Sequence, residues 1–139
     1  MYLDTGVLAK LFVIEPDSEA CAARVSGSVI VSSELAYGEL FSTLLRKERA
    51  KEINASQREL LWADFERQIK GESIFLAVLD GSIVRKARQV MLKVHPHVPL
   101  RTLDAIHLAT YLSVITGPLF TKDVRMRDAA RLLDIPLVE

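Results

Sequence analysis

Four acidic residues of this 139-residue chain stand where an α/β fold would bring them to one edge of a sheet. Asp4 follows a short apolar run at the start of the chain, and Glu39 lies in the second turn of a predicted helix. Asp104 opens another predicted helix, and Asp123 comes two residues after Thr121, at the end of a further apolar run. In open α/β sheets, strand ends and helix starts share the carboxyl edge, where ligands and catalytic groups collect. We therefore predict that these carboxylates meet at one rim.

Each acid taken alone also has an ordinary structural interpretation. Asp4 and Asp123 fit the capping or first-turn acids of the helices that follow them. Glu39 points away from the apolar stripe of its helix, which is typical of a surface acid. Asp104 is less ordinary, because it heads the apolar stripe of its own helix. That stripe comprises Leu108, Tyr111, Leu112 and Ile115.

The coincidence of these acids favours a cation site. Carboxylates brought within a few ångström repel one another, so either some of them bind protons or a cation lies among them. Hard oxygen ligands, with a single cysteine in the chain, favour Mg²⁺ or Mn²⁺ over zinc, and we expect Asp4, Asp104 and Asp123 to hold the ion. Such a site suits the hydrolysis of phosphodiester bonds, because the ion activates water and neutralises charge on the phosphate.

Composition predicts one compact domain over residues 1–139, because 50% of the chain is hydrophobic. The 18 Lys and Arg residues balance 18 Asp and Glu residues, which argues against a protein that coats nucleic acid. The lone Cys21 excludes an internal disulfide and suits a reducing compartment. No apolar run approaches the roughly 20 residues of a membrane span, and no basic region precedes an apolar stretch at the N-terminus. We therefore expect a cytoplasmic protein without membrane association.

Hydrophobic periodicity predicts strands that alternate with helices, and hence a mostly parallel sheet of about five short strands between two helical layers. The strands are predicted at 1–3, 28–31, 73–78, 119–121 and 137–138. The helices are predicted through 8–12, 19–23, 37–45, 56–69, 82–94, 103–115 and 124–133. Ser56 with Glu59 fits a capping box, and Thr102 fits the cap of the helix that contains Asp104.

Four pieces of the chain together resemble the PIN domain, and most closely the VapC-type toxins of toxin–antitoxin pairs. They are Tyr2-Leu3-Asp4-Thr5, the helix at Glu39-Leu40, the run from Leu103 to Ala109, and Thr121-Lys122-Asp123. The resemblance implies a three-layer α/β/α fold and a Mg²⁺- or Mn²⁺-dependent endoribonuclease whose acids match Asp4, Glu39, Asp104 and Asp123. It also implies that Thr121 supports the acid cluster, that the protein forms a homodimer, and that a partner antitoxin silences it.

The chain departs from the family pattern at two places. The family usually has Ser or Asn two residues after the first acid, whereas this chain has Gly6, so a hydrogen bond beside the metal site is expected to come from Thr5 or from water. The last helix ends in Leu133-Asp134-Ile135, where a glycine is more usual.

Basic residues near the predicted rim are candidates for contacts to RNA phosphates, which position a substrate without reading its bases. They are Lys122, Arg46, Arg125 and Arg127, of which Lys122 is the best candidate because it neighbours Asp123. Each of them also fits an ordinary solvated surface residue. His107 lies one turn from Asp104 and either donates a hydrogen bond to the site or, as we favour, simply packs in the helix.

Three other functions were weighed against a ribonuclease. A phosphotransfer receiver or aspartyl phosphatase requires a second acid beside Asp4, and Thr5-Gly6 supplies none. A dinucleotide-binding fold requires partner glycines after Gly6. A catalytically degenerate PIN-like module that only binds RNA or protein stays open, although the presence of all four acids counts against it.

Overall fold

A computed structural model describes residues 1–114 and 116–139 as a parallel sheet between two layers of helices. The strands are β1 (Tyr2–Leu3), β2 (Ile30–Ser33), β3 (Ile74–Ala77) and β4 (Leu119–Phe120), in the spatial order β3-β2-β1-β4. The helices are α1 (Thr5–Ala9), α2 (Ser18–Val25), α3 (Leu35–Arg49), α4 (Ala55–Lys70), α5 (Gly81–Val94), α6 (Thr102–Tyr111) and α7 (Val124–Leu132). The predicted three-layer α/β/α architecture is therefore confirmed.

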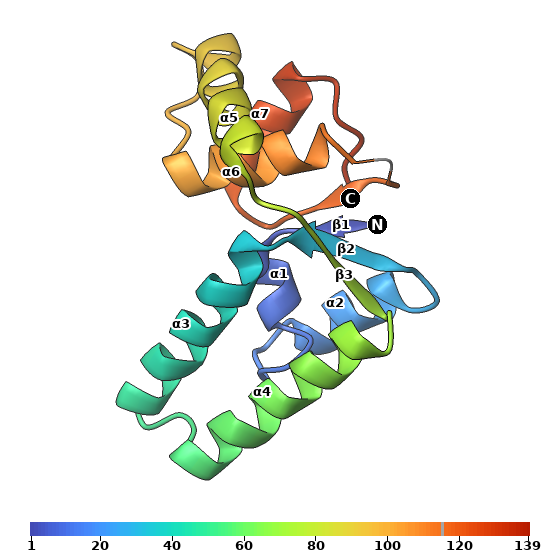
Figure 1. The fold of residues 1–139 in the computed structure, drawn as a ribbon, viewed down its shortest axis with the longest axis vertical. Coiled ribbons are helices and arrows are strands. Elements are labelled where there is room, and N and C mark those ends of the chain that lie inside the picture. Colours follow the sequence, from blue (N-terminus) through green and yellow to red (C-terminus); the bar gives the residue numbers. More distant parts are fainter. Residues whose placement is uncertain (115) are drawn as a thin grey trace.

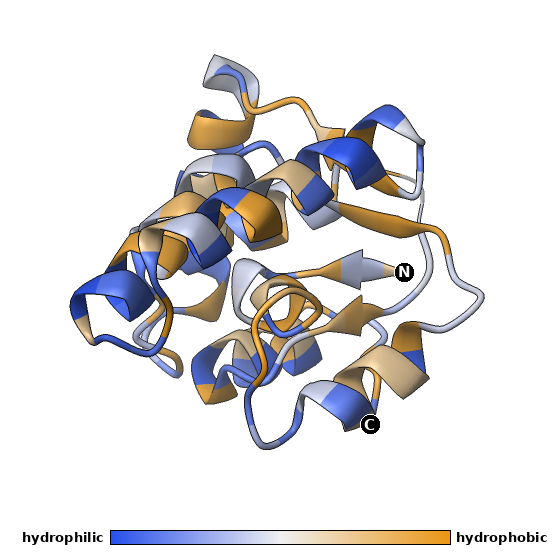
Figure 2. Cartoon of the chain, turned by 90° about the horizontal axis from the view of Figure 1, so that it is seen from below, coloured by the Kyte–Doolittle hydropathy of each residue, from blue (hydrophilic) through white to orange (hydrophobic). Residues whose placement is uncertain are grey.

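Successive side chains along each strand point to opposite faces of the sheet and form two hydrophobic cores, one on each face. Tyr2 packs with α5, α6 and α7, whereas the next residue, Leu3, packs with the helices on the other face. Leu119 and Phe120 of β4 divide in the same way. Figure 1 shows α5, α6 and α7 on one side of the sheet and α1 to α4 on the other. In Figure 2, which is coloured by hydropathy, the strands lie between helices that carry both hydrophobic and hydrophilic residues.

The parallel register brings the carboxyl ends of three strands to one edge. Tyr2 of β1 pairs with Val31 on one side and with Leu119 on the other. Asp4 therefore leaves β1 beside the point where β4 ends at Phe120, and its backbone N–H donates to the Phe120 carbonyl over 3.3 Å. The N-terminus of α3 follows directly from the end of β2, at the same edge.

The prediction of five strands is wrong, because the sheet in the described part of the chain has four. Leu137 makes only an isolated parallel bridge to Leu119. The preceding residue, Pro136, has no N–H to extend a ladder, although its carbonyl accepts from Leu119 N–H over 2.8 Å.

Two predicted helix caps are also corrected. Helix α4 begins two residues early, because Asn54 and Gln57 form the capping box in place of Ser56 and Glu59. The N-cap position of α6 is occupied by Arg101, which makes no side-chain cap, and Thr102 is the first helical residue. Helix α6 ends at Tyr111, and the end predicted for it, Ile115, lies outside the described residues.

In the turn after α7, Asp134 takes the place of the glycine that more usually ends such a helix. Asp134 has a φ of 55°, in the left-handed region that Asp and Asn tolerate better than most residues.

Within the parts of the chain that the structure describes, no helix is long and apolar enough to span a bilayer.

Candidate active site

A pocket of about 620 Å³ opens at the carboxyl edge of the sheet, and all four predicted acids line it. Asp4 reaches it from the end of β1, Glu39 from α3, Asp104 from the first turn of α6, and Asp123 from the loop after β4. The wall also includes Thr5, Gly6, Lys10, Glu15, Ser42, Thr43, Arg46, His107 and Lys122. The prediction from topology that the acids share one rim is thus realised in the structure.

Asp4 is the most deeply placed acid, with only 6% of its surface exposed. It is the N-cap of α1, and its Oδ1 accepts a hydrogen bond from Val7 N–H over 2.8 Å. Its Oδ2 accepts from the hydroxyl of Thr121. Burial raises the pKa of Asp4 above its ordinary value, although the Thr121 and Val7 hydrogen bonds oppose the shift. The ionised form is therefore disfavoured in the free protein.

Thr121 and Asp123 continue this network after β4. The Thr121 oxygen accepts from Asp123 N–H over 3.1 Å while its hydroxyl donates to Asp4. Asp123 caps α7 by accepting from Met126 N–H over 3.0 Å, and its other oxygen lies 3.5 Å from an Arg125 nitrogen. Thr121 thus orients Asp4 from behind, outside the pocket wall.

Asp104 has a carboxylate oxygen without a hydrogen-bond donor in the part of the chain that the structure describes. Its Oδ2 is buried and has no hydrogen-bond partner among the described residues. Burial raises the pKa of Asp104, and the charge of Asp123 raises it further. An oxygen that lacks a donor inside an acidic pocket fits a cation better than it fits a helix cap, whose oxygens would accept from backbone N–H groups.

Glu39 is not the surface acid that its helical position suggested, because it is half-buried and bonded on the side facing α1 and α6. Its Oε2 accepts from the Thr5 hydroxyl and lies 2.9 Å from His107 Nε2. Burial alone would raise the pKa of Glu39, but the hydrogen bonds from His107 and Thr5 outweigh it and lower the pKa below its ordinary value. Glu39 therefore stays ionised near neutral pH.

The interpretation of His107 as a simply packed residue missed its polar contacts. The ring is 3% exposed, and besides Glu39 it contacts Thr5 Oγ1 at 3.1 Å and Tyr2 Oη at 3.1 Å. The spacing of three residues from Asp104 was the available signal. Nothing in the periodicity of β1 indicates that Tyr2 faces the same cluster.

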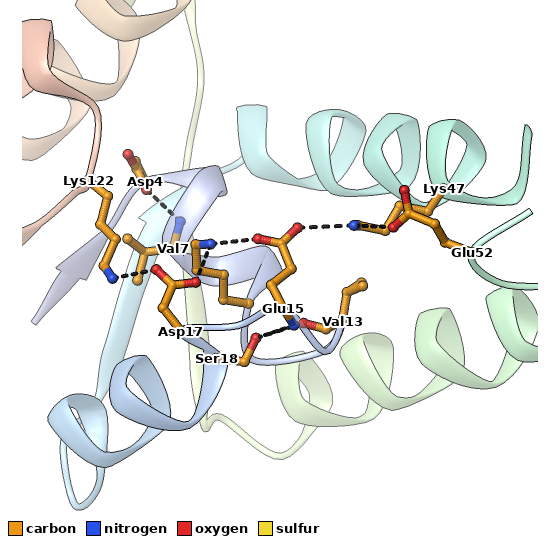
Figure 3. Close-up of polar contacts among 10 residues, drawn as sticks. Asp4, Val7, Val13, Glu15, Asp17, Ser18, Lys47, Glu52 and Lys122 are labelled. Carbon is orange, nitrogen blue, oxygen red and sulfur yellow. Dashed lines mark hydrogen bonds and ion pairs between the residues drawn. The ribbon is translucent and has the colours of Figure 1, made fainter. Parts of the chain in front are cut away.

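A chain of ion pairs that the sequence did not reveal runs along one wall of the pocket, from the rim toward the far end of α3 (Figure 3). Lys122 pairs with Asp17, and Asp17 lies 2.7 Å from Lys10. Lys10 also lies 2.5 Å from Glu15, which lies 3.1 Å from Lys47. Lys47 ends the chain at Glu52, over 2.6 Å. The chain ties the segment between α1 and α2 to α3 and to the loop after β4.

The predicted RNA-contact residues differ in what they already bind. Lys122 and Arg46 line the pocket, but Lys122 is paired with Asp17. Arg125 lies beside Asp123. Arg127 instead holds the C-terminal segment, through the carbonyls of Thr121 and Val138. Arg46 has no acidic partner among the described residues.

The acids line one pocket without forming a preassembled set of metal ligands among the described residues. Among the residues that the structure describes, no group of three or more His, Cys, Asp or Glu side chains lies close enough to hold an ion by itself. A Cβ atom at Gly6 would lie 3.5 Å from Asp4 Oδ1, an ordinary van der Waals contact, so there is room for a side chain where this chain has none.

Comparison with known proteins places these features in a family. The family model described as "PIN domain" matches residues 1–132. Ribonuclease VapC46 of Mycobacterium tuberculosis (strain ATCC 25618 / H37Rv) is 38% identical over 144 residues, which cover 99% of this chain and 95% of the relative. Ribonuclease VapC35 of the same species, from strain CDC 1551 / Oshkosh, is 32% identical over 143 residues, again 99% of this chain and 95% of the relative.

Proposed function

Because the chain belongs to the PIN-domain family, we propose that it is an endoribonuclease that cleaves RNA phosphodiester bonds, and that it acts as the toxin of a type II toxin–antitoxin pair. The single observation that carries the proposal is the pocket of four acids, in which Asp104 presents a buried oxygen without a donor. The ribonuclease names of the relatives support the reaction class.

The donor set fits Mg²⁺ or Mn²⁺. Carboxylate oxygens are the hard ligands that Mg²⁺ prefers, and Mg²⁺ keeps several water ligands besides one or two carboxylates. The three Asp side chains of the pocket would have to approach one another to bind the ion together, because no such group converges among the described residues. We propose that Asp104, with Asp4 and Asp123, holds the ion. When bound, the ion neutralises charge on the phosphate and lowers the pKa of water beside it.

The chain's own residues then have separate roles. Asp4 is fixed through Thr121 and Val7, so its position does not depend on a ligand. Glu39 is ionised and half-buried, which suits it to orient attacking water by accepting a hydrogen bond from it at the pocket. Thr5 holds Glu39 and supplies the hydrogen bond that Gly6 cannot.

RNA is positioned by the basic residues at the rim. Arg46 is the best placed, because it lines the pocket together with Ser42, Thr43 and Glu39 on one face of α3 and is not neutralised by an acid among the described residues. Lys122 must leave Asp17 before it can contact a phosphate. Arg125 contributes only if it leaves Asp123.

The test of the reaction is cleavage of RNA by the purified protein with Mg²⁺ or Mn²⁺, with Asp104→Asn compared with Asp128→Asn. Asp128 forms a surface pair with Arg131 on α7 and does not line the pocket, so it is a matched control. We expect a loss of about 100-fold or more for Asp104→Asn and wild-type cleavage for Asp128→Asn. Undiminished cleavage by Asp104→Asn would contradict the assignment of the acid pocket as the active site. Absence of cleavage by the wild type with either ion would favour the alternative of a catalytically degenerate module that only binds RNA or protein.

The toxin role has its own test. We expect expression of the wild-type chain to arrest growth, and expression of Asp104→Asn to permit it. We also propose that the protein is a homodimer and binds a small antitoxin beside the acids, so the inactive variant should copurify with that antitoxin when the two are co-expressed. Normal growth with a wild-type protein that cleaves RNA in vitro would contradict the toxin role but not the reaction.

A further inference from the structure

We propose that His107 is a positioning residue that holds Glu39 through Nε2, and that Tyr2 supports the ring from its other side through a hydrogen bond to Nδ1. The inference rests on the proposed function, because it concerns the same acid pocket. It assigns work to two residues that are neither acids nor metal ligands. Both residues are buried, Tyr2 fully and His107 to within 3%.

The geometry joins four elements at one ring. His107 projects from α6, its Nδ1 lies 3.1 Å from the hydroxyl of Tyr2 on β1, and its Nε2 lies 2.9 Å from Glu39 Oε2 on α3. The same Nε2 lies 3.1 Å from the Thr5 hydroxyl at the start of α1. The rings of Tyr2 and His107 meet edge to face, with an interplanar angle of 79°. A side chain that only filled space would not need both ring nitrogens within hydrogen-bond distance of polar atoms.

Counting donors assigns the hydrogens. An ionised carboxylate can only accept, so Nε2 must carry the hydrogen that it donates to Glu39. In the neutral ring Nδ1 is then an acceptor, and the phenol of Tyr2, which keeps its hydrogen near neutral pH, donates to it. The opposite tautomer would turn the Nε2 lone pair toward the carboxylate. Glu39 therefore sets the tautomer, and the Tyr2 hydroxyl, which can donate or accept, matches it by donating to Nδ1.

The consequence is an ordered carboxylate with one available oxygen. Glu39 Oε2 takes both donors, from His107 and from Thr5, whereas Oε1 accepts no hydrogen bond from the described residues. Since partners behind a functional group fix its orientation, this arrangement leaves Oε1 for water or substrate in the pocket.

Two substitutions at one position separate positioning from packing. In His107→Gln the amide N–H reaches the place of Nε2, whereas in His107→Asn the shorter amide does not reach Glu39. We expect kcat for RNA cleavage to fall about 10- to 100-fold in His107→Asn, with little change in KM, and to recover most of the way in His107→Gln. Equal losses in the two variants, or full activity in a folded His107→Asn protein, would overturn the proposal.

The tautomer is measured independently of catalysis, by ¹⁵N NMR of histidine-labelled protein without RNA or metal. The chain has three histidines, and His107→Gln identifies the His107 signals by removing them. We expect Nε2 to carry a hydrogen, a shifted Nδ1 signal in Tyr2→Phe, and a shifted Nε2 signal in Glu39→Gln.

Several NMR results would contradict the proposal. A wild-type ring protonated only at Nδ1, or an Nε2 signal that ignores Glu39→Gln, would overturn the positioning role. An Nδ1 signal that does not change in Tyr2→Phe would overturn the role of Tyr2. If the wild type cleaved no RNA, the proposed function would fail, while these spectra would still decide whether His107 holds Glu39.

Discussion

The N-cap position of Asp4 and its burial place opposite demands on its charge. As an N-cap it benefits from a negative charge near the start of α1, but its burial favours the neutral acid. The folded protein therefore raises the pKa of Asp4. A raised pKa means that the favourable contribution is present below the ordinary pKa of 3.8 and is lost as the pH rises through the folded value.

Asp4→Asn should consequently change how the stability depends on pH. Asn caps helices as well as Asp does but leaves the Thr121 hydroxyl without its acceptor. Without divalent ions, we expect the free energy of unfolding of the variant, relative to the wild type, to rise by about 0.5–2 kcal/mol as the pH rises from the acid range to 7. The variant should lose this relative gain as the pH falls and wild-type Asp4 binds a proton. Urea denaturation across pH measures the change.

Asp80→Asn is the matched control for this substitution. Asp80 also caps a helix, but it is exposed and its hydrogen bonds lower its pKa, from the Ser82 side chain first and then from the backbone N–H groups of Ile83 and Ser82. Asp80→Asn should therefore lower stability at pH 7. If the stability of Asp4→Asn relative to the wild type fell with rising pH, as expected for Asp80→Asn, burial would not disfavour the charge of Asp4.

Sequence reasoning found the acids but not how they are held. Asp4, Asp104 and Asp123 follow from strand ends and helix starts, which are local features. Topology and the resemblance placed Glu39 at the rim, but a helical wheel has one apolar stripe and cannot show that Glu39 bonds to Thr5 of α1 and His107 of α6. His107 and Tyr2 meet across 105 residues, and no local pattern encodes that contact.

At the scale of elements, the segment between α1 and α2 is fixed by charge rather than by secondary structure. Asp17 has a pKa lowered to about 2 by hydrogen bonds from Lys10 and then from Lys122. The depressed pKa means that this contribution is present above pH 3.8 and is lost as the pH falls toward 2. The tether between this segment and the loop after β4 is therefore intact throughout the neutral range.

Lys122→Ala should raise the pKa of Asp17 from about 2 toward 3.8, because one of its two lysine partners is removed. An NMR titration of the Asp17 carboxyl carbon reads the change directly. Arg131→Ala, which removes the partner of Asp128 on α7, should leave Asp17 unaffected. An unchanged Asp17 pKa in Lys122→Ala would mean that Lys122 is already free to contact RNA.

The elements themselves were largely predictable, and the errors lie at their ends. Four of the five predicted strands exist, since short β-branched or apolar runs between turns are a local signal. The capping box of α4 was misplaced by two residues because Asn54 with Gln57 and Ser56 with Glu59 both fit the spacing. The choice between them depends on how α4 packs.

At the scale of the whole molecule, the carboxylates of Asp4 and Asp104 lower the stability of the folded protein in the absence of a bound cation. Asp4 and Asp104 both have raised pKa values, Asp104 through burial and then through the charge of Asp123. A cation that binds only the folded protein stabilises it by mass action, by roughly 2.7 kcal/mol at one hundred times Kd. The apparent Tm should therefore rise with Mn²⁺ or Mg²⁺.

The pH dependence of that shift separates the pocket from nonspecific ion binding. Because the ion must displace protons from carboxylates with raised pKa values, the rise in Tm should be smaller at pH 5 than at pH 7.5. Asp104→Asn should abolish most of it, and Asp128→Asn should keep it. A rise in Tm that persists in Asp104→Asn would locate the ion elsewhere on the molecule. A rise that does not depend on pH would contradict the raised carboxyl pKa values on which the proposed site depends.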